Sequence, residues 1–400
     1  MMYYKAYKFR IYPNENQRTL INKTLGSTRF VYNYFLNILK ENGYKKANEN
    51  IKYYTNFLKY EYPFLQEIES TPINKALFNL EDSYKRFFSN KGCYPKFKSK
   101  FSKNSYNTTA VYGTYKNYNY CNIKLDLKNK TIKLPKLKVM KIRGYRNTES
   151  INGRILNVTI SKETNGKYYA SVLFEIRDKI NKTVPTSIVG IDLGIKNLLT
   201  LSDGTIFENN KYILKYEKRI KRMQKAVSRK AKSSENYKKC KQKLATLHSK
   251  LANARKYYIH KITKNITDEY DIITCEKLHT KEMIINGKKT TLSKNINDAS
   301  FNEILKQLEY KSKFKGKQFY QIYDYYPSSQ TCSVCENIDK KYKSLNERIY
   351  KCPKCHLEID RDLNASINIM FEGVKMYMKN YCSVVIIKKE QINLKIYYVR

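Results

Sequence analysis

The chain has 400 residues, 41% hydrophobic and 14% aromatic, which is enough apolar material for at least one complete core and two or three domains. This composition excludes a disordered tail. There are 78 Lys and Arg residues but only 35 Asp and Glu, which gives a formal net charge of +43. The chain therefore repels itself unless it binds a polyanion. Nucleic acid is the expected partner; the alternative is that codon bias alone raised the lysine content.

The nine cysteines indicate a reducing compartment. Four recur at regular spacing and five are scattered, namely Cys93, Cys121, Cys240, Cys275 and Cys382. An odd number without a disulfide framework is typical of reducing conditions. The N-terminal segment MMYYKAYKFRIYP lacks the apolar stretch of a signal peptide, and no apolar run approaches the ~20 residues that span a bilayer. We expect a soluble, cytoplasmic protein.

The first 178 residues predict a strand, then helices, then a run of short strands. Residues 3–12 alternate basic with apolar positions and predict a strand that Pro13 ends. Asn14 can then cap one helix, or two helices broken near Gly26. A further helix is expected from Thr71-Pro72 to about Phe88. Residues 106–178 consist of short Tyr-, Ile-, Val- and Thr-rich runs that predict a small β-barrel.

The second half predicts a mixed α/β domain. SIVGIDLGIKNLLTLSDGTIFEN, from residue 187, indicates two strands joined by a turn. Residues 211–264 contain 19 Lys or Arg against two Glu, with apolar residues at helical spacing, and predict a pair of long helices with a basic outer face. DIITCEKL (271–278) predicts a buried strand, 300–311 a helix, and QFYQIYDYYP a strand that leads into the cysteine cluster.

Two CxxC pairs, Cys332 with Cys335 and Cys352 with Cys355, are separated by 16 residues. Each turn directs two thiolates inward, and two turns complete the tetrahedron of a zinc ribbon. Four thiolates leave no open position for water, so we expect one structural zinc ion. The alternative, a pair of redox motifs, requires a strand-to-helix context that neither pair has. His356 follows directly and is expected to be a neighbour of the site.

Three acidic segments are candidates for a catalytic metal site. Asp192 lies inside the apolar segment VGIDLG, Glu276 ends the strand DIITC, and Asp360 and Asp362 begin an Ala-containing helix after the cysteines. A buried Asp requires a partner or a metal. One Asp, one Glu and one Asp from separate elements can bridge two Mg²⁺ or Mn²⁺ ions, which activate water and stabilise the leaving oxygen of a phosphodiester.

Each acid also has a simpler interpretation. Asp192 is then a strand-end residue, Glu276 is solvated, and Asp360 or Asp362 caps a helix. The segment GIDLG also resembles the first phosphate loop of actin-like ATPases, which share the ribonuclease-H-type fold. Such an ATPase requires a second Asp-x-Gly-Gly loop downstream, and the sequence contains none.

The order of these motifs resembles one family. GIDLG, CEKL, SFNEILKQLEYKSKFKG, YPSSQTCSVC, CPKC and DRDLNASINI occur as in the TnpB (OrfB) proteins of bacterial insertion sequences, which are relatives of type V CRISPR effectors. YKAYKFRIYPNENQ near the N-terminus, RFVYN at 29–33 and YPKFKSK at 94–100 are similar to that family too. The resemblance extends from about residue 3 to about residue 373.

The resemblance implies an α/β protein with a ribonuclease-H-like (RuvC) nuclease core, an inserted zinc ribbon, and an N-terminal β-barrel that carries a helical insertion. The expected domains are a wedge-like barrel (1–12 and 96–183), a helical recognition domain (13–95), the nuclease (184–329 and 357–373) and the ribbon (330–356). Residues 374–400 stay unassigned. His356 stands where the family usually has glycine after the last CxxC.

The implied activity is RNA-guided cleavage of DNA for a transposable element. Asp192, Glu276 and Asp362 take the catalytic positions with two Mg²⁺ or Mn²⁺ ions, and Asp362 is preferred to Asp360 because the family's acid directly precedes x-Asn-Ala. The expected partners are a guide RNA and double-stranded target DNA, without a membrane or a small-molecule substrate. Lys75 and Asn79, one helical turn apart, are expected to read the target-adjacent duplex.

Two alternatives belong to other functional classes. One is a catalytically silent, RNA-guided DNA-binding regulator, and the complete set of three acids argues against it. The other is a transposase that acts in DNA strand transfer. The tyrosine type of transposase requires a His-hydrophobe-His motif, and the four histidines are too scattered to form one.

Overall fold

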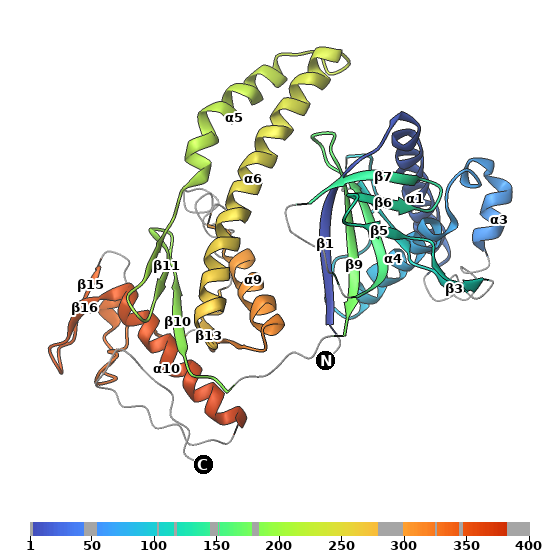
Figure 1. Cartoon of the computed structure of the whole chain (residues 1–400). Helices are drawn as coiled ribbons and strands as arrows, with labels where there is room; N and C mark the ends of the chain where they lie inside the picture. Colours follow the sequence, from blue (N-terminus) through green and yellow to red (C-terminus); the bar gives the residue numbers. More distant parts are fainter. Residues whose placement is uncertain are drawn as a thin grey trace. The chain divides into compact units, whose positions relative to one another are not determined.

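The computed structural model describes residues 3–43, 54–101, 104–115, 118–144, 151, 153–177, 184–278, 299–324, 326–343 and 347–381. The chain divides into two compact units, Met1–Lys179 and Ile180–Arg400. Many of their elements are labelled in Figure 1. Among the described helices, none combines the length and apolar character that crossing a membrane requires.

The first unit is built on a seven-stranded antiparallel sheet with the order β2-β8-β9-β1-β7-β6-β5. The strands are β1 (Tyr3–Tyr12), β2 (Asn104–Thr109), β5 (Lys124–Asp126), β6 (Thr131–Leu134), β7 (Lys138–Arg143), β8 (Arg154–Lys162) and β9 (Tyr168–Ile176), and β3 (Tyr112–Tyr115) pairs with β4 (Tyr118–Cys121). Strand β9 buries every second residue, as the period of two requires. β2 and β5 lie at the two edges, so the expected closed barrel is not confirmed.

The helices of this unit are α1 (Glu15–Asn42), α3 (Tyr54–Glu61), the 3₁₀ turn η1 (Pro63–Leu65) and α4 (Ser70–Phe88). Asn14 caps α1 through a reciprocal capping box with Gln17. The helix continues through Gly26 without a break, so the one-helix alternative is correct. Its first half contributes Ile21 and Leu25 to the core beneath the sheet, and its second half packs with α3 and α4 in a separate core.

The second unit is built on a five-stranded sheet with the order β12-β11-β10-β13-β14. The strands are β10 (Ile188–Leu193), β11 (Asn197–Leu201), β12 (Ile206–Glu208), β13 (Ile272–Cys275) and β14 (Gln318–Gln321). β10, β11 and β12 pair antiparallel, whereas β10, β13 and β14 are parallel. The helices are α5 (Tyr212–Ser228), α6 (Glu235–Glu269), α9 (Phe301–Phe314) and α10 (Arg361–Tyr381), and the cysteine region holds η2 (Lys340–Lys343), β15 (Ile349–Lys351) and β16 (Glu358–Asp360).

This sheet is the middle of three layers. Successive residues of a strand point to opposite faces. Val189 and Ile273 therefore pack with α6 and α9, whereas Ile188 and Ile272 pack with α10 on the other face. Helix α10, red in Figure 1, runs beside β10 and β13 and continues to Tyr381, past residue 373 where we expected the nuclease domain to end.

Two glycines let α10 lie directly on the strands. A Cβ at Gly190 would come 2.1 Å from the carbonyl oxygen of Ser366, and a Cβ at Gly373 would come 1.9 Å from Oγ1 of Thr274. Either contact would force the backbones apart. The close approach fixes the position of the first turn of α10 relative to the ends of β10 and β13.

Candidate active site and metal centre

Asp192 and Glu276 emerge from neighbouring parallel strands at the same edge of the sheet. Ile191 of β10 is in register with Cys275 of β13, and each acid is the next residue in its chain. Ile191 and Cys275 belong to the core under α6 and α9. Since side chains alternate, Asp192 and Glu276 project toward the opposite face, where α10 lies.

Asp362 joins them from the first turn of α10. Burial raises the pKa of Asp192 well above its ordinary value, and the negative charges of Glu276 and Asp362 raise it further, although the Arg361 guanidinium partly offsets them. Glu276 and Asp362 are thus each close enough to Asp192 to disfavour its charge. The structure therefore brings together the three acids that the sequence singled out.

The three carboxylates are more widely spaced than the ligands of a compact metal site. Among the described residues, the four cysteines are the one group of three or more candidate ligands whose atoms all lie within 4.8 Å of one another. Glu276 accepts a hydrogen bond from the Ser328 hydroxyl, and burial raises its pKa. Asp362 lies 3.8 Å from Arg348. The donor set consists of hard oxygen atoms, which suit Mg²⁺ or Mn²⁺.

Asp360 has a different role from Asp362. Its side chain is exposed and lies at the end of β16, and Oδ1 accepts hydrogen bonds from the backbone N–H groups of Asp362 (2.9 Å) and Leu363 (3.1 Å). This is the geometry of a helix N-cap. Asp360 satisfies two donors at the start of α10 and helps to hold Asp362 in the first turn.

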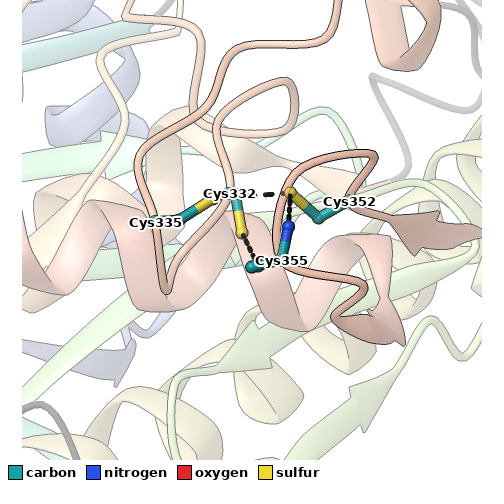
Figure 2. Close-up of side chains that lie close together, drawn as sticks. All are labelled: Cys332, Cys335, Cys352 and Cys355. Atoms are coloured by element: carbon teal, nitrogen blue, oxygen red, sulfur yellow. Dashed lines mark hydrogen bonds between the residues drawn. The ribbon is translucent and has the colours of Figure 1, made fainter.

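The four cysteines form a compact cluster, shown in Figure 2. The Sγ atoms of Cys332 and Cys355 are 3.5 Å apart, and those of Cys335 and Cys352 are 3.4 Å apart. A tetrahedron with Zn–S bonds of about 2.3 Å has S···S distances of about 3.8 Å. The cluster is therefore compatible with one structural zinc ion, as its spacing in the sequence predicts.

The two CxxC turns share the same backbone geometry. The backbone N–H of Glu336 donates to the carbonyl oxygen of Cys332, and the backbone N–H of His356 donates to that of Cys352, each at 3.0 Å. Both donors have a positive φ, 61° at Glu336 and 57° at His356. Only glycine adopts this left-handed region without strain. The structure thus accounts for the glycine that the family usually has here, because His356 stands at a position that favours glycine. The His356 side chain lies outside the group of four ligands.

The second CxxC turn favours the thiolate form of Cys352. Burial raises the pKa of Cys352, but the backbone N–H groups of Cys355 and Lys354 and the thiols of Cys335 and Cys355 outweigh this effect and lower it to about 6. In contrast, burial raises the pKa of Cys332 to about 12. A zinc ion is bound by thiolates, so occupancy requires the loss of that proton.

The cysteine region is fastened to α10 by two buried amides that sequence reasoning missed. Nδ2 of Asn364 donates to the carbonyl oxygen of Thr331 (2.7 Å), and its Oδ1 accepts from the N–H of Ser333 (3.0 Å). Nδ2 of Asn368 donates to the carbonyl oxygens of Ser328 and Thr331. Their i, i+4 spacing on the helix was the available signal. These bonds link the ribbon, Ser328 and the acid-bearing helix.

A groove on the α5 and α6 hairpin carries a concentrated positive charge. Its volume is about 470 Å³, and its cationic lining residues are Arg219, Arg222, Lys239, Lys243 and Lys250. None of these five forms an ion pair with a described residue. Two of the four acids of these helices, Glu217 and Glu235, are paired with Lys221 and Lys238 instead. Five unneutralised cations around one groove favour a polyanionic ligand.

Lys75 and Asn79 lie on α4 as predicted. Asn79 is exposed, and Nζ of the half-buried Lys75 lies 5.3 Å from the ring centroid of Phe78, which is itself exposed. The i, i+4 spacing keeps both side chains on one face. Their reading of bases stays a prediction.

Three family profiles match successive parts of the chain. Residues 1–48 match one described as "Helix-turn-helix domain", residues 171–286 one described as "Probable transposase", and residues 301–369 one described as "Cas12f1-like, TNB domain". The described part of residues 1–48 forms strand β1 and the single helix α1 rather than two helices. The third range contains all four cysteines.

Full-length relatives carry names that state an activity. The chain is 31% identical over 388 residues to "Putative RNA-guided DNA endonuclease InsQ" of Escherichia coli, with 92% of each chain covered. It is 31% identical over 377 residues to "Putative RNA-guided DNA endonuclease" of Streptomyces pristinaespiralis, covering 92% of this chain and 89% of the relative. A Cas12f1 in complex with sgRNA and target DNA superposes with a TM-score of 0.49 at 13% identity, covering 92% of this chain and 98% of the other.

The cysteine cluster predicts a defined metal content. The purified chain should contain about one zinc ion, and Cys352→Ser should lose it because three thiolates no longer close the tetrahedron. Elemental analysis after gel filtration measures the ratio. Cys240→Ser, which removes a scattered cysteine, is the control and should keep the ion. Full zinc retention in Cys352→Ser would refute the assignment.

The positive φ of His356 predicts a stabilising substitution. His356→Gly should stabilise the ribbon by about 1 kcal/mol, because glycine adopts the left-handed region without the strain that other residues incur. Competition with a zinc chelator would measure this as slower or weaker zinc removal. His356→Ala retains the strain and should show no gain. Equal behaviour of the two variants would contradict the backbone explanation.

Proposed function

This chain belongs to the TnpB (OrfB) family of insertion-sequence proteins, and on that basis we propose that it is an RNA-guided DNA endonuclease of a transposable element. The observation that carries the proposal is the convergence of Asp192, Glu276 and Asp362 on one face of the sheet, where the charges of Glu276 and Asp362 raise the pKa of Asp192. The names of two relatives that align over most of their length support the same activity.

The sheet topology supports a ribonuclease-H-like nuclease core. A three-stranded antiparallel part continues into parallel strands β13 and β14, with helices on both faces. In this proposal the core comprises 184–329 and 357–381, because Val374 and Tyr377 of α10 also pack on the sheet, and the ribbon (330–356) is inserted before α10. The wedge-like part (1–12 and 96–183) and the helical part (13–95) hold the nucleic acid.

The proposed chemistry is hydrolysis of a DNA phosphodiester. Asp192, Glu276 and Asp362 would hold two divalent ions, and Mg²⁺ or Mn²⁺ bound there supplies an activated water and stabilisation of the leaving oxygen. The chain's own residues prepare this site. Ser328 orients Glu276 through its hydroxyl, and Asp360 fixes the turn that carries Asp362. Neutralisation by a cation would relieve the repulsion that raises the pKa of Asp192.

Binding of the guide and target relies on the basic surface. The net charge is +43, and the five cations of the α5 and α6 groove have no ion-pair partner in the described part of the chain. Both features favour phosphate contacts along an extended nucleic-acid backbone. Such contacts position a duplex without reading its bases. Pairing between guide RNA and target strand then supplies most of the sequence specificity.

We expect Asp192→Ala, Glu276→Ala and Asp362→Ala each to abolish DNA cleavage while RNA and target binding change little. The carboxylates act on the metal ions, whereas affinity comes mainly from phosphate contacts. Loss of any one ligand disorders the shared site, so the three defects should be similar and not additive. Cleavage of a matched plasmid in Mg²⁺ or Mn²⁺, beside a gel-shift assay, measures both properties.

Asp360→Ala is the matched control for this series. Its loss removes the cap of α10 and should cost about 1 kcal/mol of stability while cleavage persists. A dead Asp360→Ala with an active Asp362→Ala would reverse the assignment of these two acids. Cleavage by all four variants would refute the assignment of these acids as the nuclease active site, and joined rather than cut DNA would favour a strand-transfer transposase.

Lys75 and Asn79 are proposed to read the duplex next to the target. Both side chains lie on one face of α4 and can reach adjacent base edges in one groove. The double variant Lys75→Ala, Asn79→Ala should therefore relax the preferred flanking sequence in a library of randomised flanks. An unchanged preference, with cleavage intact, would assign this face of the helix a structural role alone.

A further inference from the structure

A polar cavity of about 260 Å³ opens in the first unit. Three segments that are distant in the sequence surround it: α1, the segment before β2, and the turn between β8 and β9. The residues that bear on its chemistry are Asn22, Gly26, Arg29, Lys100, Lys162 and Glu163. Asn22, Gly26 and Arg29 recur at i, i+4 and i+7, so α1 presents them along one face.

The cavity walls are held in place by specific bonds. Nδ2 of Asn33 donates to the carbonyl oxygen of Lys98 (2.9 Å), and Oδ1 of Asn33 accepts from the Lys98 N–H (2.8 Å). This pair fastens the segment that carries Lys100 to α1. Nζ of Lys162 donates to Oδ1 of Asn22 (2.9 Å) and fastens the β8–β9 turn. The motifs RFVYN (29–33) and YPKFKSK (94–100), far apart in the chain, thus meet at this cavity.

The charges around the cavity are not balanced. Arg29 is half-buried, and its guanidinium forms no hydrogen bond or ion pair with any described residue. Lys100 likewise has no acidic partner in the described part of the chain. The one acidic lining residue, Glu163, is already engaged by Lys8 (3.0 Å) and by Asn165 (3.1 Å). A half-buried guanidinium with five unused donors favours an anion that accepts two hydrogen bonds at once.

Gly26 is a second, independent observation. It lies in the interior of α1, where glycine destabilises a helix relative to alanine. Gly190 and Gly373 are explained by contacts within the chain, but a Cβ at Gly26 would meet no atom within 4 Å. No packing within the described structure therefore requires a glycine here. The space that its missing side chain leaves belongs to the cavity beside Arg29.

We propose that this cavity binds a phosphodiester group of a nucleic-acid strand. Arg29 would hold two phosphate oxygens, Lys100 and Lys162 would add positive charge, and the bare backbone at Gly26 would let the strand approach α1 closely. The site lies in the first unit and takes no part in the proposed hydrolysis. It rests on the proposed function only in that the partner is a nucleic acid, and RNA or DNA could supply the phosphate.

The test is a binding measurement on the full chain in an Asp192→Ala background. Because a phosphate contact requires no base sequence, the probes are a labelled single-stranded RNA and a single-stranded DNA of one fixed sequence. Gly26→Leu fills the open space with a strong helix former and changes no charge. Arg29→Gln removes the guanidinium, and Arg29→Lys keeps the charge but loses the bidentate geometry. Lys133→Gln, an exposed cation outside the cavity, is the matched control for loss of one charge.

Gly26→Leu and Arg29→Gln should each weaken binding roughly tenfold or more, Arg29→Lys by less, and Lys133→Gln by less than about threefold. The melting temperature of Gly26→Leu should equal or exceed that of the parent. A loss confined to RNA or to DNA identifies the source of the phosphate. If both cavity variants bind both probes like Lys133→Gln, the proposal is wrong. The result does not depend on cleavage, so failure of the nuclease assignment is separately visible.

Discussion

The close packing of α10 against β10 and β13 is the contact on which the second unit depends. Gly190 and Gly373 remove the two side-chain atoms that would separate the helix from the sheet. This approach places Asp362 beside Asp192 and Glu276, and the same helix holds the cysteine region through Asn364 and Asn368. The ribbon and the three acids are therefore coupled through one rigid helix. A change in the ribbon can alter the acidic site without touching an acid.

Burying Asp192 next to Glu276 and Asp362 lowers the free energy of unfolding. Burial and like charges disfavour the ionised form of Asp192, and Arg361 offsets only part of this effect. Core residues chosen for stability alone would be apolar at these positions. Such a conflict between local stability and residue choice is typical of functional sites. The cysteine cluster shows the opposite case, because its thiols already lie near the spacing of a tetrahedral site.

Local signals in the sequence predicted the elements well. The cap at Asn14, the helix up to Phe88 and the strand DIITC follow from capping, proline placement and apolar runs, and the structure confirms them. The expected start at Thr71 was one residue late, because α4 begins at Ser70 with Glu69 at its N-cap, so Thr71 is not the cap. The cysteine cluster was predictable too, because the spacing within each CxxC pair is a local signal. The sequence could not predict what depends on distant contacts. The edges β2 and β5, the fit of Gly190 against Ser366, and the bonds of Asn368 to the ribbon all join residues far apart in the chain.

Glycine illustrates why a residue type alone does not reveal its role. The sequence left open whether Gly26 breaks a helix, and α1 passes through it without interruption. Gly190 is required by the chain's own packing, but Gly26 faces open space beside the Arg29 guanidinium, which has no partner among the described residues.

The α5 and α6 groove and the Arg29 cavity also differ physically. The exposed α5 and α6 groove gains affinity mainly from counterion release, which salt weakens. Arg29 is half-buried, so a hydrogen-bonded pair there is screened less and selects an acceptor by geometry. The first kind attracts any polyanion, and the second can fix the register of a strand that has already bound.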